Sequence, residues 1–229
     1  MHKDEDVNAL AVKVRNLTKE YSDGKNTTRV LKGIDVEIKK GEFVAIMGRS
    51  GAGKSTFLYQ LGLLDKPTTG NIELMGKSVS HLSEQQKSIF RLNELGFIFQ
   101  DYALLPELTA QENVALPLLM QGKNQEVAFA LAKDTLKRVG MEGKEKNLPS
   151  ELSGGQQQRV SVARAVAHNP HIVFADEPTA NLDSYSGAQV IELFKKLNNE
   201  GQTIVMVTHE EEYGNIADRI IRLSDGLVV

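Results

Sequence analysis

Cysteine is absent from the 229 residues of this chain. That absence excludes disulfide bonds, thiolate zinc sites and cysteine nucleophiles, and it agrees with a cytosolic location without establishing one. Long apolar runs are missing too, since none approaches the roughly 18 to 20 residues that span a bilayer. The opening sequence MHKDEDVNAL is too acidic and too polar for a signal peptide. Any membrane role of this chain must therefore depend on a partner.

A basic excess is the third feature that the sequence lacks. Lysine and arginine number 27 against 30 acidic residues, so the net charge is −3 and the pI is about 6.0. No overall basic field would draw the protein to DNA or RNA, and we expect no nucleic-acid partner. Hydrophobic residues make up 41% of the chain, and the sequence has no internal repeat. This composition suits one large domain, or one domain with a subdomain.

The first third of the chain is rich in strand patterns. Alternating apolar residues predict half-buried strands over residues 11–17 and 30–39. The run EFVAIM at residues 42–47 is typical of a strand buried on both faces. A glycine-rich stretch follows it at once and precedes a helical pattern.

Helical patterns dominate from about Ser83 onward and include a predicted helix over residues 125–139. Apolar strands return at residues 172–175 and 203–207, with a helix near residues 187–198 between them. We therefore expect an α/β fold in which central parallel strands carry flanking helices and a helical insertion.

The glycine-rich stretch GRSGAGKS, residues 48–55, has the spacing of a P-loop. Its glycines let successive N–H groups wrap a phosphate, and Lys54 can meet the terminal phosphates. The Ser55 hydroxyl can bind Mg²⁺ at the positive end of a helix. The residues expected around the phosphates are Gly48, Arg49, Ser50, Gly51, Ala52, Gly53, Lys54, Ser55 and Thr56.

Two further strand ends carry candidate catalytic groups. In HIVFADEP, Asp176 can hold Mg²⁺ through water, and Glu177 would project toward the terminal phosphate as a general base. An Asp-Glu pair after a strand is often only a solvated strand end, but a P-loop in the same sheet favours the catalytic interpretation. In TIVMVTH, His209 is either structural or carried to the γ-phosphate by a strand beside the P-loop strand. The other histidines lie outside any ligand pattern: His2, His81, His168 and His171.

Five motifs in this order resemble those of the ATP-binding cassette (ABC) ATPases, and the likeness spans nearly the entire chain. They are GRSGAGKST, FQDYALLP, LSGGQQQR, FADEPTANLD and VTHE, which resemble the P-loop, Q-loop, signature, Walker B with D-loop, and switch histidine. The resemblance implies a RecA-like core with an antiparallel β subdomain and an inserted helical subdomain. GLLDKPTTG and LLPELTAQENVALPLL are similar to the LolD, MacB and FtsE branch. Relatives often continue beyond the terminal DGLVV.

The resemblance implies that the signature acts on a second copy of the chain. In such cassettes two ATP molecules lie between two head-to-tail copies, and the P-loop of one faces the signature of the other. Ser153, Gly154, Gly155 and Gln156 would then contact the γ-phosphate held by the partner, through a hydroxyl and N–H groups at a positive helix end. The alternative is that Ser153 merely caps its own helix.

Three more positions carry roles that come from the resemblance. Tyr21 would stack on adenine; alternatively it is an ordinary surface or core tyrosine. Gln100 would reach Mg²⁺ and the attacking water, or it is a solvated loop residue. Asp183 would couple the two sites across the dimer, or it caps the next helix with Ser184. The implied metal contacts are Ser55, Gln100 and Asp176 through water, and the implied catalytic residues are Lys54, Gln100, Glu177 and His209.

The implied function is an ATPase subunit that uses ATP and Mg²⁺ to power a separate membrane permease from the cytoplasmic face of the membrane. The alternative within the family is a soluble ABC ATPase without a membrane partner. DNA-repair members need a long coiled coil and ribosomal members normally carry two cassettes, and this sequence has neither. A P-loop kinase or GTPase leaves LSGGQ unexplained, and the guanine-reading N-K-x-D motif is absent.

The expected docking place for the permease lies beside Gln100, on the segment from Tyr102 to Pro117. This segment packs several aliphatic residues and two prolines directly after the Q-loop. It could instead close the core of the helical subdomain. We place that subdomain at about residues 100–157, and the core with its β subdomain at about residues 1–99 and 158–229.

Overall fold

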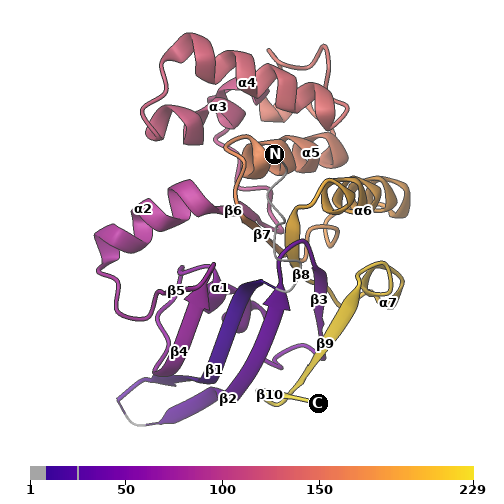
Figure 1. The fold of residues 1–229 in the computed structure, drawn as a ribbon. Coiled ribbons are helices and arrows are strands. Elements are labelled where there is room, and N and C mark those ends of the chain that lie inside the picture. Colours follow the sequence, from indigo (N-terminus) through magenta and orange to yellow (C-terminus); the bar gives the residue numbers. More distant parts are fainter. Residues whose placement is uncertain (1–8, 25) are drawn as a thin grey trace.

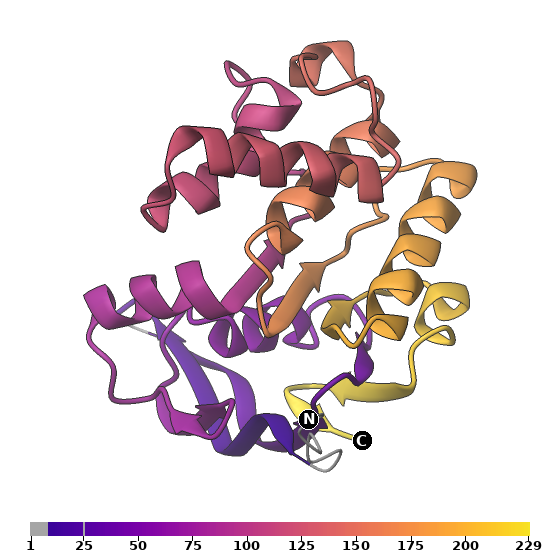
Figure 2. The same ribbon diagram turned by 45° about the horizontal axis from the view of Figure 1, so that its top comes forward.

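The computed structural model describes residues 9–24 and 26–229. The polar N-terminal residues 1–8, which argue against a signal peptide, and His2 lie outside this range. Two sheets organise the fold. In the figures, helices α3 and α4 cover one end of the molecule and strands β1 and β2 lie at the opposite end (Figures 1 and 2).

The smaller sheet is antiparallel, with four strands in the order β2-β1-β4-β5. Its strands are β1 (Leu10–Ser22), β2 (Thr27–Lys39), β4 (Thr69–Leu74) and β5 (Lys77–Ser78). The two strands predicted from alternation are confirmed in β1 and β2, although each is longer than its apolar pattern. Buried side chains such as Val12 and Val14 of β1 and Ile72 of β4 form one face of this sheet.

The larger sheet has six strands in the order β10-β9-β3-β8-β7-β6 and is parallel from β9 to β6. Its strands are β3 (Phe43–Met47), β6 (Leu95–Ile98), β7 (Ile172–Asp176), β8 (Thr203–Val207), β9 (Arg219–Ser224) and β10 (Leu227–Val228). Every residue of β3, β7 and β8 is buried, as the continuous apolar runs predict.

Both faces of the larger sheet are covered. In β8, Ile204 and Met206 belong to one hydrophobic cluster and Val205 and Val207 to the other. Side chains alternate between the faces of a strand, so this division places a core on each side of the sheet. The helices are α1 (Lys54–Leu61), α2 (Glu84–Glu94), α3 (Ala110–Met120), α4 (Gln125–Arg138), α5 (Gly154–Val166), α6 (Ser184–Asn199) and α7 (Glu211–Gly214), with a 3₁₀ turn at Pro149–Glu151.

The helical region differs from the pattern expected from about Ser83 onward. Ser83 caps α2, but β6 follows α2 and pairs with β7 inside the parallel sheet. The strand pattern of LGFIFQ, residues 95–100, which ends at Gln100, is confirmed by β6 over its first four residues. Helices α3, α4 and α5 pack together beyond it (Figure 1). The expected subdomain limit at residue 157 falls within α5.

None of the helices within residues 9–24 and 26–229 is long and apolar enough to cross a membrane.

Candidate active site

The carboxyl ends of β3, β8 and β7 meet at one edge of the larger sheet, because these strands are parallel neighbours. Gly48 follows β3, Glu177 follows β7, and His209 lies two residues after β8. The prediction that the strand before His209 lies beside the P-loop strand is confirmed. Ligands of open α/β sheets bind at such an edge. A cleft of about 630 Å³ opens there, lined by Met47, Gly48, Arg49, Ser50, Lys54, Glu177, His209, Glu211 and Arg222.

Helix α1 begins without a side-chain cap. Its N-cap is Gly53, which has a φ of 96° and offers no hydrogen-bond acceptor from its side chain. The N–H groups of the first turn thus receive no acceptor from their cap, and the positive end of the helix remains available to an anion such as phosphate. In contrast, the next five helices all begin on capping side chains, namely Ser83, Thr109, Asn124, Ser153 and Asp183.

Lys54 adds a buried positive charge at the same place. It is only 7% exposed, and its Nζ donates to the carbonyl oxygens of Gly48 at 3.0 Å and Arg49 at 3.2 Å. Within the described part of the chain these partners are neutral carbonyls rather than carboxylates. A buried ammonium without an anionic partner is costly, so this position favours an anionic ligand.

Oxygen ligands suited to Mg²⁺ lie at the next residue of α1. The Ser55 hydroxyl donates to Asp176 Oδ1 over 2.9 Å, and Asp176 is buried at the end of β7. Mg²⁺ is usually held by one or two carboxylates together with water and substrate phosphates. The described residues contain no group of three or more His, Cys, Asp or Glu side chains that could hold a metal. Ser55 and Asp176 therefore fit a metal ion whose remaining ligands would be water and the phosphates of a bound nucleotide.

Tyr59 contacts the same carboxylate and was not singled out in the sequence. Burial raises the pKa of its hydroxyl above the ordinary value of 10.0, and a hydrogen bond to Asp176 raises it further. The hydroxyl thus stays protonated and donates to Asp176. Its position four residues after Ser55 is the signal that could have identified it, because residues i and i+4 share one helix face.

Glu177 and His209 form a pair at the cleft. Glu177 Oε2 lies 3.2 Å from His209 Nδ1. Glu177 has a φ of 44°, a conformation that costs a residue other than glycine about 1–3 kcal/mol. Its N–H donates to the Val207 carbonyl oxygen over 3.0 Å, which ties the strained residue to β8. The backbone thereby directs a carboxylate, beside an imidazole, into the cleft.

The signature residues lie elsewhere on the molecule. Ser153 is exposed at the start of α5, and neither it nor Gly154, Gly155 or Gln156 lines the cleft. Ser153 Oγ accepts a hydrogen bond from the Gln156 N–H, and Gln156 Oε1 accepts one from the Ser153 N–H. Ser153 therefore does cap its helix, as the alternative had it. The exposed, positive start of α5 therefore lies outside the cleft of its own chain.

A family model described as ABC transporter matches residues 31–180. This chain belongs to the ABC transporter family. It corresponds to the ATPase cassette of that family, which confirms the resemblance seen in the motifs. The lipoprotein-releasing system ATP-binding protein LolD of Aquifex aeolicus is 50% identical over 87% of this chain and 89% of its own length. The macrolide export ATP-binding/permease protein MacB of Mannheimia succiniciproducens is 50% identical over 95% of this chain.

The cassette spans about a third of the length of its MacB relatives, 34% for the protein of Mannheimia succiniciproducens. Among solved structures, the dimeric ATP-binding cassette MJ0796 with bound ADP and Pi is 44% identical. It covers 95% of this chain and 96% of its own, with a TM-score of 0.88. The predicted ABC cassette fold is confirmed, and homologous cassettes form dimers.

Gln100 is exposed and does not line the cleft of the ABC cassette. It lies two residues beyond β6, and its carbonyl oxygen accepts a hydrogen bond from Asn181 Nδ2 over 3.0 Å. The following residues Tyr102 and Ala103 both have positive φ angles. Arg164 of α5 donates to their carbonyl oxygens, so the signature helix holds the Q-loop. Arg164 is a second residue that the sequence interpretation missed.

Other motif residues contact one another or α1, and the remaining histidines of the described residues lie outside the cleft. Thr179 Oγ1 donates to Glu210 Oε1 over 2.8 Å, which links the segment after Walker B to the one after the switch histidine. Tyr21 on β1 lies beside the first turn of α1, because its hydroxyl interacts with the Thr56 side chain. The three other histidines of the described residues do not line the cleft, namely His81, His168 and His171.

Asp183 is the N-cap of α6. Its Oδ1 accepts from the Ser186 N–H over 2.9 Å and its Oδ2 from the Ser186 hydroxyl over 2.8 Å. These hydrogen bonds, led by the one from the backbone, lower the pKa of the Asp183 carboxyl. Asp183 thus caps the helix through Ser186, and Ser184 is the first helical residue.

We predict that Asp183→Ala lowers the Tm by roughly 2–4 °C and that Asp183→Asn does not, because asparagine is an equally good cap. Thermal unfolding at neutral pH measures both. A lowered folded-state pKa gives stability that is present above the unfolded value of 3.8 and lost as the pH falls through the folded pKa. The difference between wild type and Asp183→Ala should therefore shrink in acid. An equal loss of Tm in both variants would contradict the capping role.

Proposed function

We propose that the chain binds ATP with Mg²⁺ in the described cleft and hydrolyses it to ADP and phosphate. The proposal rests on three features that lie together at one edge of the sheet: the uncapped start of α1, the buried Lys54 ammonium and the strained Glu177. Phosphates bind to the N–H groups of residues 48–56, and Lys54 turns from its loop carbonyls to the terminal phosphates. The ATPase class of the cassette supports this assignment.

Glu177 is proposed as the general base that takes a proton from the attacking water. His209, 3.2 Å from its carboxylate, holds that carboxylate and contacts the γ-phosphate. Ser55 and Asp176, the latter through water, with Gln100, would hold Mg²⁺, which neutralises charge on the phosphates. Ser55 and Asp176 already bond to each other beside Lys54. Gln100 is exposed and its carbonyl oxygen is bonded to Asn181, so its proposed contact requires the Q-loop to move toward the nucleotide.

We propose that two copies of the chain complete each site. P-loop and catalytic groups line the cleft, while the start of α5 is exposed outside it. Ser153, Gly154, Gly155 and Gln156 of one copy would contact the γ-phosphate held by the other, and Asp183 would lie near this contact. The dimeric MJ0796 cassette supports a dimer as the working state. Hydrolysis removes the γ-phosphate contacts and releases the copies.

We also propose a membrane permease as the partner, with the cassette on the cytoplasmic face of the membrane. The MacB relatives carry a permease in the same protein, as their name states, and LolD is named for lipoprotein release. A cassette that works without a membrane partner is the alternative. The first idea predicts that an integral membrane protein co-purifies with the chain, and the second predicts that none does.

The proposed docking segment from Tyr102 to Pro117 is buried only in its second half, within α3. Ala110, Val114 and Ala115 pack in the hydrophobic cluster of the helical region, so this part of the segment closes that core. Leu105 is 43% exposed, however, and remains available to a partner. We therefore narrow the proposed contact to the exposed side of this segment, around Leu105.

We predict that Glu177→Gln keeps ATP binding and lowers turnover by about 10²–10⁴-fold, because the phosphate cradle remains while the base is lost. Phosphate release measures turnover, and size exclusion with ATP and Mg²⁺ measures dimer formation, which the trapped ATP should favour. Glu212→Gln is the matched control: this nearby exposed carboxylate should leave turnover unchanged. Wild-type turnover in Glu177→Gln, or a monomer at saturating ATP, would refute the assigned role.

We predict that Leu105→Glu lowers recovery of the permease roughly tenfold or more, since it places a charge in an apolar contact. Affinity-tagged chain is isolated from membranes of its own host, and the co-purified membrane protein is quantified. Leu131→Glu is the control, because Leu131 is 38% exposed on α4 of the same helical region. Both variants should bind ATP as wild type does. Equal recovery with the folded Leu105→Glu chain would contradict docking at this segment.

A further inference from the structure

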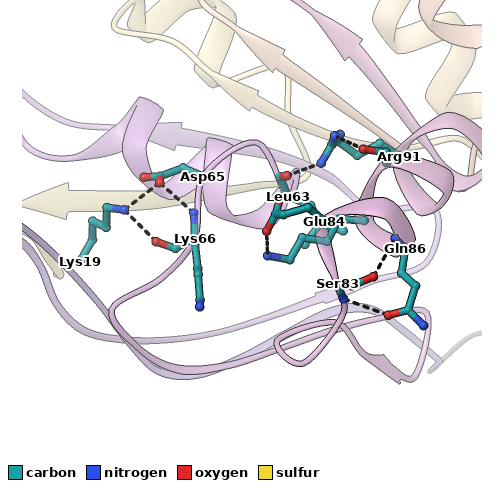
Figure 3. A network of polar contacts seen from close by, with 10 residues as sticks. Lys19, Leu63, Asp65, Lys66, Ser83, Glu84, Gln86 and Arg91 are labelled. Carbon is teal, nitrogen blue, oxygen red and sulfur yellow. Dashed lines mark hydrogen bonds and ion pairs between the residues drawn. The ribbon is translucent and has the colours of Figure 1, made fainter.

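The segment that follows α1 is held in place from two sides. It reverses the chain at residues 62–66, and the Leu64 N–H donates back to the Tyr59 carbonyl oxygen over 2.8 Å. On one side Lys19 Nζ donates to Asp65 Oδ1 and to the Lys66 carbonyl oxygen, both over 2.7 Å. On the other side Arg91 of α2 donates to the Leu63 carbonyl oxygen over 2.7 Å. Figure 3 shows both groups of contacts converging on this segment.

Asp65 is the point at which this segment meets Tyr21. The Tyr21 hydroxyl donates to Asp65 Oδ2 over 2.8 Å, while Oδ1 accepts from Lys19. Burial opposes the charge of Asp65, but the hydrogen bonds from Lys19 and Tyr21 lower its pKa. Asp65 thus stays ionised at neutral pH, with each carboxylate oxygen bonded to a different neighbour.

Lys19 also fixes one face of the Tyr21 ring. Its Nζ lies 4.6 Å from the ring centroid, a cation–π distance. The Lys19 side chain is 11% exposed and forms its ion pair with Asp65, whereas Tyr21 is 47% exposed. A planar ligand can therefore stack only on the opposite face of Tyr21.

Helix α1 connects the Lys19, Asp65 and Tyr21 contacts to the phosphate site. The first turn of α1 carries Lys54 at the cleft, Ser55 bonded to Asp176, and Thr56 beside the Tyr21 hydroxyl. The last turn leads into Asp65. Both ends of α1 thus contribute to the place where a nucleotide with its phosphates at the P-loop would put its base.

We propose that Asp65 and Lys19 are positioning residues for adenine binding: together they lock the Tyr21 ring in the orientation that the base requires. The inference rests on the proposed contact between Tyr21 and adenine. Without the lock, Tyr21 would have to be ordered when the nucleotide binds, and ordering one such side chain weakens binding by about 2- to 10-fold.

The test compares ADP with pyrophosphate, which lacks the base, by isothermal titration calorimetry with Mg²⁺. Tyr21→Ala should weaken ADP binding about 5- to 100-fold, as expected for a lost stacking contact. Tyr21→Phe, which keeps the ring and removes only the hydroxyl that donates to Asp65, and Asp65→Ala should each weaken ADP binding about 2- to 10-fold. The double variant that combines Tyr21→Phe with Asp65→Ala should bind ADP no more weakly than either of these single variants. Pyrophosphate affinity should stay unchanged throughout.

Glu73→Gln is the matched control, because Glu73 forms an ion pair with Lys13 on the same antiparallel sheet. It should leave both affinities at the wild-type value. If Tyr21→Ala weakens ADP binding while Tyr21→Phe and Asp65→Ala do not, the positioning role is wrong and the adenine contact stands. If Tyr21→Ala binds ADP normally, the adenine contact itself fails. Additive losses in the double variant, or an equal loss of pyrophosphate affinity in Asp65→Ala, would also overturn the proposal.

Discussion

The uncapped first turn of α1 is the feature on which the site depends. In five other helices, a Ser, Thr, Asn or Asp side chain at the N-cap accepts a hydrogen bond from an N–H group of the first turn. Helix α1 instead has Gly53 as its N-cap. Placing Lys54 there adds a charge that is only 7% exposed. A bound anion would accept hydrogen bonds from the free N–H groups of this turn and would also neutralise the charge of Lys54. The neighbouring strands then bring Asp176, Glu177 and His209 to the same edge, so the fold aims its polar chemistry at that anion.

The second constraint is that one copy leaves the site open. The cleft is lined by the end of β3, the P-loop, the residues that follow β7 and β8, and single residues of α7 and β9, while the exposed start of α5 lies outside it. Arg164 in the same helix holds the carbonyl oxygens of Tyr102 and Ala103. Whatever binds the start of α5 is therefore mechanically connected to the Q-loop. In the proposed dimer, this connection would give a physical route from nucleotide binding to the surface around Leu105.

Much of this arrangement could be predicted from the sequence because it is local. The run before Gly48 is apolar throughout, and β3 is buried throughout; the same holds for β7 and β8. The apolar stretch LGFIFQ likewise predicts a strand, and β6 forms over its first four residues. Tyr59, Arg164 and Asp65 escaped because their partners, Asp176, Tyr102 and Tyr21, are distant in sequence. The sequence also did not show that Gln100 lies outside the cleft, since its position depends on where β6 ends.

Cross-linking between two copies tests the head-to-tail site most directly, and the absence of native cysteine makes it clean. Ser50→Cys and Ser153→Cys are introduced into separate Glu177→Gln chains that carry different tags, and the chains are mixed with a short bismaleimide. With ATP and Mg²⁺, the account predicts mixed Ser50–Ser153 products well in excess of both like-with-like products, and little cross-linking without ATP. Equal yields of the three products, or yields that do not respond to ATP, would contradict it.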